Sequence, residues 1–193
     1  MKHALKKAAV AGIVGEILYF ISMASFLLTQ NEAALTFWEA MTVAGAVIML
    51  IVLAVIADEY KIQQMHHRLM LISLSGTVFL TSLAHFTSIG VIRKLESQGV
   101  SVPDHFKIGA SPSIEMTIDY TAWGFFMGAA FIALFLGVKA KTIKIFSAVC
   151  GLLCLCGFVG SFISDPLWYI APLGYGIGFL LMCVFVLRSA KAR

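Results

Sequence analysis

The sequence predicts an all-α polytopic membrane protein: a compact bundle of six transmembrane helices with the N and C termini in the cytoplasm. Hydrophobic residues make up 60% of the chain and charged residues 12%; soluble domains have roughly 45–50% and 25%. Each of six apolar runs approaches the roughly 20 residues that span a bilayer. We place the spans, within one integral-membrane domain over 1–193, at about 8–28, 37–57, 69–92, 118–138, 143–163 and 167–187.

The positions of the basic residues predict the orientation. Eleven of the 14 Lys and Arg residues fall at the termini or in alternate connections, and the other three are Arg93, Lys94 and Lys107. Such an excess marks cytoplasmic loops, and an odd number of spans would put the termini on opposite faces. The net charge of +4 then reflects loops that face anionic lipid, not nucleic acid. We interpret the chain as an integral protein of a bacterial cytoplasmic membrane, with the lipid bilayer as its partner.

The first span carries an acid in its middle. Glu16 makes a cleavable signal peptide a poor interpretation, because a signal core is short and apolar. A carboxylate at this depth is costly and usually faces the bundle interior. We expect Glu16 to face other helices, with Tyr19 or the third span supplying a partner. Gly12 and Gly15 would let a neighbouring helix come close.

The third span carries a polar stripe. Its members recur every three or four residues and therefore share one helix face: Ser73, Thr77, Thr81, His85 and Ser88. Two interpretations stay open. The stripe is hydrogen-bonded glue between helices, or it is the wall of a polar cavity or proton path that includes Thr77 and Thr81. His85 supports the second, because histidine titrates near neutral pH.

Two further acids share the depth of His85. Glu39 lies at the expected outer start of the second span and Asp119 near that of the fourth. Acids in the first turns of helices also have a structural explanation, since they stabilise the positive helix end. The shared depth predicts that the three side chains approach one another. The resulting candidate ligand site comprises His85, Glu39, Asp119, Tyr120, Trp123 and Tyr175.

Two connections shape the predicted outer side. The segment 93–117 is long, and its start can continue the third helix until Gly99 stops it. We expect Ser111 to cap the fourth helix early and Asp165 to cap the sixth, each followed by a proline. The 93–117 segment would then cover the pocket, as long ordered loops often do.

Small residues in the last two spans predict close packing. The four cysteines, Cys150, Cys154, Cys156 and Cys183, lie within spans and fit packing better than disulfide or metal chemistry. Gly174 and Gly178 form a small-xxx-small pair. We predict no metal site and no cofactor.

Three classes of function remain open at this point. The leading hypothesis is an outward-facing pocket that binds or transports a small, amphipathic molecule, with Glu16 continuing the polar path inward. The alternative is an intramembrane enzyme acting on a lipid or isoprenoid-like substrate, with His85, Glu39 and Asp119 as candidate catalytic residues. The third is an accessory subunit without a ligand, in which the stripe is buried glue.

Overall fold

The computed structural model is all-helical, and six of its helices are long and apolar enough to cross a membrane. It describes the backbone of 2–192 and the side chains of 3–189, so the side chains of Lys2 and Lys191, and all of Arg193, lie outside the described residues. The long helices run over His3–Thr29, Glu32–Glu59, Gln64–Ser97, Ile114–Gly137, Lys141–Ser161 and Asp165–Ser189. Several extend beyond the predicted apolar runs, because a helix continues past its most apolar stretch.

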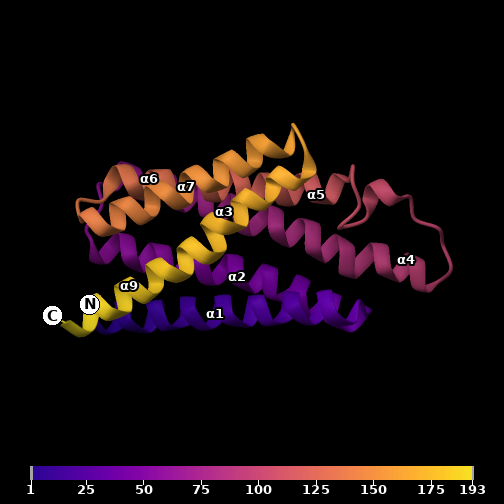
Figure 1. Ribbon diagram of the computed structural model, residues 1–193, viewed down its shortest axis with the longest axis horizontal. Helices are drawn as coiled ribbons and strands as arrows, with labels where there is room; N and C mark the ends of the chain where they lie inside the picture. Colours follow the sequence, from indigo (N-terminus) through magenta and orange to yellow (C-terminus); the bar gives the residue numbers. More distant parts are fainter. Residues whose placement is uncertain (1, 193) are drawn as a thin grey trace.

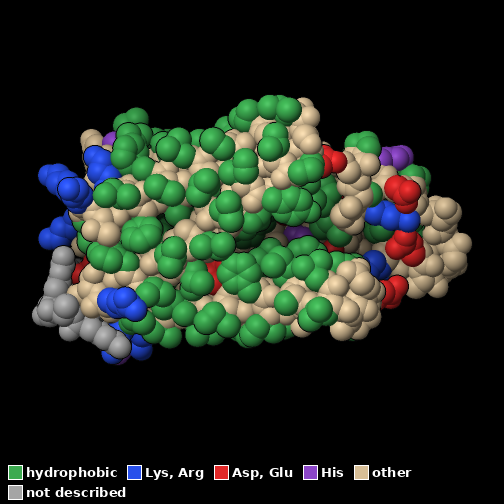
Figure 2. Space-filling view, viewed as in Figure 1, with side chains coloured by type: hydrophobic (Ala, Val, Ile, Leu, Met, Phe, Trp, Pro, Cys, Tyr) green, Lys and Arg blue, Asp and Glu red, His purple; other side chains and the backbone are tan. Residues whose placement is uncertain are grey.

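The six helices lie side by side along the long axis, and both ends of the chain lie at one end of the bundle (Figure 1). We call this the terminal end and the opposite one the loop end. The first two spans are α1 (Lys2–Thr29) and α2 (Glu32–Glu59), and the third is α3 (Gln64–Thr87) continued by α4 (Arg93–Ser97). Lys and Arg side chains gather at the terminal end (Figure 2).

Of the other three spans, the fourth and the sixth consist of several helical segments, and the fifth is a single helix. The fourth joins α5 (Ile114–Tyr120) to α6 (Met127–Gly137), and the fifth is α7 (Lys141–Ser161). The sixth begins with a 3-10 turn (Asp165–Tyr169), passes through α8 (Ile170–Pro172) and ends in α9 (Phe179–Ala192), which crosses the bundle obliquely (Figure 1).

Glycines set the close contacts between these helices, as the sequence predicts. A Cβ atom on Gly174 would lie 2.6 Å from the Cys150 carbonyl oxygen, and one on Gly178 would lie 2.6 Å from the Cys150 Sγ. On α1, a Cβ on Gly12 would meet the Sγ of Cys183 at 2.7 Å. The packing role predicted for the cysteines therefore holds for Cys150 and Cys183, which are buried and free. Cys156 is free but exposed.

Three spans contain a π-helical turn within the part of the chain that the structure describes. These turns are η1 (Ser88–Ile92), between α3 and α4; η3 (Thr121–Phe126), between α5 and α6; and η5 (Leu173–Gly178), between α8 and α9. Each lies in the half of its span nearer the loop end. A π turn widens the helix locally, frees backbone groups and is frequent at functional sites.

The helix caps at the loop end differ from those predicted. The third helix does continue to Ser97, and Gly99 follows it with φ of +78°. The prediction of Ser111 as the helix cap is wrong, because Ser113 caps α5 and its Oγ accepts from the Met116 N–H. Asp165 is not the cap of the sixth span either, because that position is Ser164.

Candidate functional site

His85 lies between two carboxylates from neighbouring helices. Its Nδ1 is 3.7 Å from Glu39 Oε1 on α2, and its Nε2 is 3.5 Å from Asp119 Oδ1 on α5. The predicted approach of these three side chains is therefore present in the structure. Only 5% of the His85 surface is exposed. Both distances exceed the 2.7–3.2 Å of an N–H···O hydrogen bond. The imidazole therefore lies between two carboxylates but forms no hydrogen bond with either of them.

Arg93 holds the Glu39 carboxylate from the other side. Its guanidinium pairs with Glu39 Oε2 and donates a hydrogen bond to the Thr36 hydroxyl. Glu39 is 1% exposed, a depth at which an ionised carboxylate needs such a partner. The helix-end explanation for Glu39 fails, because α2 begins at Glu32 and Glu39 lies about two turns inside it.

Two residues of the site, Arg93 and Glu115, are not among those that the sequence predicts for it. The sequence predicts only that Arg93 belongs to the outer connection. Glu115 is buried and interacts electrostatically with His85 and Arg93. It lies four residues before Asp119 on α5, so the two carboxylates share one helix face. That spacing was readable in the sequence. We define the polar cluster as Glu39, His85, Arg93, Glu115 and Asp119.

The three π turns adjoin this cluster. Turn η1 separates His85 from Arg93 on the third span, and η3 begins two residues after Asp119. Turn η5 contains Tyr175, whose hydroxyl interacts electrostatically with Asp119. Turns η3 and η5 meet through Trp123 and Tyr175, whereas η1 lies nearer the loop end, beyond the level of His85 and Asp119. Irregular backbone is tolerated at membrane depth where it is buried in protein or lines a cavity.

Aromatic rings form a second layer around the cluster. Trp123 and Tyr175 lie with ring centroids 4.7 Å apart, and Tyr120 stacks on Trp168 at 4.2 Å. Trp168 in turn lies 6.4 Å from Tyr175. Of the three aromatic members of the predicted site, Tyr175 and Tyr120 interact electrostatically with Asp119, and Trp123 contacts Tyr175. Tyr120 also lines a separate cavity, described below.

Glu16 is buried, as expected, and of its two predicted partners, Tyr19 and the polar stripe of α3, only Tyr19 interacts with it. Helix α1 packs against α2 and α9, so the polar stripe of α3 is not its partner. Glu16 lies beside Gly176 in η5, where an added Cβ would come within 3.9 Å of its Oε2. The hydroxyls of Tyr19 and Tyr175 each interact electrostatically with both Glu16 and Asp119. Each of these two tyrosines is therefore within electrostatic range of both the deep acid and the polar cluster.

Two threonines of the polar stripe on α3 differ in their hydrogen bonding. Thr77 donates a hydrogen bond of 3.1 Å to the Ala122 carbonyl oxygen in η3, and it is fully buried. This contact between helices is the structural role that the sequence left open. Thr81, one turn further, is also fully buried, and its hydroxyl has no hydrogen-bond partner among the described residues. Thr81 precedes His85 by four residues on α3, about one helical turn.

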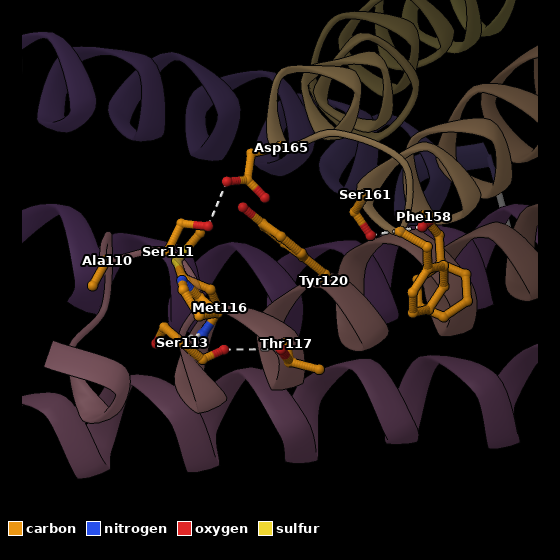
Figure 3. A pocket seen from close by; sticks show the side chains of 11 residues that line it. Ala110, Ser111, Ser113, Met116, Thr117, Tyr120, Phe158, Ser161 and Asp165 are labelled. Carbon is orange, nitrogen blue, oxygen red and sulfur yellow. Dashed lines mark hydrogen bonds between the residues drawn. The ribbon is translucent and has the colours of Figure 1, made fainter.

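A small cavity opens near the loop end, apart from the polar cluster (Figure 3). Its volume is about 160 Å³, and its lining includes Tyr120, Ser113, Ser161 and Asp165. The Ser111 hydroxyl donates a hydrogen bond to Asp165, which ties the connection to the start of the sixth span. The two residues predicted as helix caps are thus partners of each other.

A hollow also lies in the apolar face of the bundle. The space-filling view shows histidine and acidic surface at its bottom (Figure 2). Large apolar side chains surround the hollow in this view. Within 2–192, no group of three His, Cys, Asp or Glu residues has the geometry to hold a metal ion. The arrangement suits acid–base chemistry and the binding of a molecule with one polar end.

Comparisons with protein families, with characterised proteins and with solved structures give no match to this chain.

Proposed function

We propose that this protein binds and carries a small amphipathic molecule in the half of the membrane nearest the loop end. The observation that carries this proposal is His85 bracketed by Glu39 and Asp119 at 3.7 and 3.5 Å. A buried polar cluster inside an apolar bundle is costly, and such clusters usually mark a ligand or proton pathway. The polar end of the molecule would meet the cluster, and its apolar body would lie in the hollow of Figure 2.

The loop end faces outward in this proposal. Lys and Arg gather at the opposite, terminal end (Figure 2), and cytoplasmic segments carry that excess. The termini are then cytoplasmic. Of the residues proposed to contact the ligand, Trp123 and Tyr175 supply aromatic surface, while His85, Glu39 and Asp119 supply charge. Tyr120, which lines the separate cavity of Figure 3, is not part of this contact.

A proton path toward the terminal end accompanies binding. Tyr19 and Tyr175 each interact electrostatically with both Asp119 and Glu16, and in this proposal their hydroxyl groups pass a proton from the cluster inward. Thr81, with its unpaired hydroxyl, adds a further step near His85. This coupling distinguishes a carrier from a passive binding site, because ligand and proton would then compete for the same carboxylates.

An intramembrane enzyme is the second candidate, favoured by one specific observation. Arg93 engages Glu39 on the side away from His85, which leaves Asp119 as the carboxylate without a fixed cation. His85 and Asp119 can therefore exchange a proton with a substrate, as a general acid–base pair does. In this reading Glu39 orients the imidazole, and a lipid or isoprenoid-like molecule enters through the hollow.

Thermal unfolding of the purified protein in nanodiscs tests the proposal. Three amphipathic probes are used: dodecylamine, dodecanoic acid and farnesol. We expect at least one to raise the unfolding temperature of the wild type and to lose that effect in His85→Asn. His105→Asn, in the exposed connection, is the matched control and should respond like the wild type. Equal shifts in His85→Asn and wild type, or no shift with any probe, would refute binding at the cluster. Turnover of farnesol without uptake into vesicles would favour the enzyme.

A further inference from the structure

The acidic residues are concentrated at the loop end. Seven of the ten acids in the sequence lie there, against three Lys and Arg: Glu32, Glu39, Glu96, Asp104, Glu115, Asp119 and Asp165. The basic residues gather at the other end (Figure 2). A protein surface that carries charges of mainly one sign raises the local concentration of counter-ions and the rate at which they bind. The loop end therefore attracts cations and repels anions.

The cationic side chains at this end are largely engaged already. Arg93 is paired with Glu39. Lys107 is paired with Glu96 at 3.0 Å and with Asp104 at 3.1 Å. Lys94 is exposed on the surface of α4. The acids of the polar cluster therefore exceed the cations that lie close to them.

Inside the cluster, Glu115 and Asp119 share His85, while Arg93 interacts with Glu115 and is paired with Glu39. Glu115 and Asp119 lie four residues apart on α5, where like charges repel each other. Each interacts with His85. Both ring nitrogens of His85 are buried without a hydrogen-bond partner among the described residues, although they point at carboxylates. An imidazole so placed relieves the repulsion only while it carries a proton. A cationic group brought by a ligand would relieve it directly.

The surrounding rings suit the same kind of ligand. Trp123 and Tyr175 lie beside Asp119 with ring centroids 4.7 Å apart, and both are largely buried. The face of an indole or phenol ring attracts an ammonium group, more strongly when both are shielded from water. Carboxylate on one side and aromatic faces on the other are the means by which proteins recognise organic cations.

We propose that the ligand of the polar cluster is an organic cation, an amine or quaternary ammonium compound with an apolar body. This inference rests on the proposed function and names its ligand class. The ammonium group lies against Asp119 and Glu115, facing Trp123 and Tyr175, and the apolar body fills the hollow. Cation binding displaces the proton of His85, which couples ligand and proton in opposite directions.

Three probes of nearly equal size and different charge test this assignment. They are phenyltrimethylammonium, its neutral isostere tert-butylbenzene, and the anion benzenesulfonate. Binding to the protein in nanodiscs is followed by tryptophan fluorescence and corrected for partition into empty nanodiscs. We expect the cation to bind at least tenfold more tightly than the neutral isostere, and the anion to bind least. Proton release on addition of the cation, measured in weakly buffered solution, is the expected companion signal.

Two variants locate the charge preference. Asp119→Asn should weaken binding of the cation at least tenfold and leave the neutral isostere unchanged. Asp104→Asn, an exposed acid of the connection, is the matched control and should leave both unchanged. If Asp119→Asn fails to fold, Glu115→Gln takes its place, with a smaller loss of several-fold. Size-exclusion chromatography of each variant checks the fold.

The outcomes separate this inference from the function on which it rests. Binding of the neutral isostere or the anion as tight as that of the cation, lost in His85→Asn, would keep the pocket and overturn the cation assignment. Equal binding of the cation by the wild type, Asp119→Asn and Glu115→Gln would also overturn the cation assignment. Absence of binding by all three probes would count against the assignment, while a stabilising neutral or acidic amphipath in the thermal assay would still support a pocket.

Discussion

Two groups of charges lie near the loop end and differ mainly in burial. In the buried group, Arg93 pairs with Glu39, which is 1% exposed. In the exposed group, Lys107 pairs with Glu96 at 3.0 Å and with Asp104 at 3.1 Å. The buried pair joins two helices that are distant in the sequence, whereas the exposed group joins residues of one connection. Only the first is shielded from water by six packed helices.

The difference teaches that an ion pair's role depends on its surroundings. Exposed pairs contribute about 0–1 kcal/mol, because water solvates both partners when they separate. Removing one partner of a buried pair costs about 3–5 kcal/mol, because the other charge stays unpaired. The exposed group arranges the connection. The buried group maintains charge in the membrane, which a bundle built only for stability would avoid.

The largest expected effect comes from Arg93→Ala. Loss of the guanidinium leaves Glu39 buried without its cation, so we expect the free energy of unfolding to fall by about 3–5 kcal/mol. Thermal unfolding in detergent or nanodiscs measures the change. The double variant Arg93→Met with Glu39→Gln should recover most of the loss, since neither retains an unpaired charge.

Lys94→Ala is the matched control for Arg93→Ala. Lys94 is the next residue on the same helix, with the same charge, but it is exposed. Its loss should leave the unfolding temperature close to that of the wild type. Equal destabilisation by the two alanine variants would mean that net charge at the loop end, and not the buried pair, is what matters.

The sequence predicted the depth of the polar cluster but only part of its membership. Apolar run length gives six spans, and counting along them puts His85, Glu39 and Asp119 at one level. The pairing of Arg93 with Glu39 was not predictable in this way, because it depends on the π turn at Ser88–Ile92 and on how α3 packs on α2. Such a turn changes the angular position of every later residue on its helix.

Local rules failed in the same region. Ser111 and Asp165 each precede a proline and fit the pattern of a helix cap, yet they bond to each other across 54 residues. Tertiary contact outweighed local preference, because a charge-assisted hydrogen bond between two segments is stronger than a cap that a neighbouring serine can supply. Glu115 was missed for a different reason, since its four-residue spacing to Asp119 was visible and only its burial was not.

A substitution at Ser111 lies between the two extremes. Ser111→Ala removes a hydrogen bond to Asp165 on an exposed part of the protein, so we expect a loss of about 0.5–1.5 kcal/mol. Hydrogen exchange should quicken in the connection and at the start of the sixth span, and stay unchanged in α2. Ser101→Ala, at another exposed serine of this connection, is the control. Uniform exchange changes along the chain would contradict a local tie.

Glu16 provides a buried acid without the ion pair that Glu39 has. No ion pair involves it in the part of the chain that the structure describes. We therefore expect Glu16→Gln to leave the unfolding temperature close to that of the wild type, because the amide keeps the size of the acid and can still form hydrogen bonds. Its effect should appear in the pH dependence of probe binding at the polar cluster. Glu59→Gln, at the terminal end, should keep the wild-type profile, and an unchanged profile in Glu16→Gln would remove it from the proton path.

The smallest effect is expected at Lys107, where the exposed group can be taken apart. Glu96 and Asp104 raise the pKa of Lys107 above its ordinary value of 10.5. A raised pKa in the folded protein means that the pairing stabilises fully below pH 10.5 and is lost as pH rises through the higher folded value. Lys107→Ala should therefore unfold at a slightly lower temperature than the wild type at neutral pH.

This difference in unfolding temperature should shrink in 1 M salt, where exposed charges are screened over about 3 Å, and vanish in strong alkali. A difference that survives both treatments would show that Lys107 acts through packing of its aliphatic chain, and the contrast between buried and exposed charge would then rest on Arg93 alone.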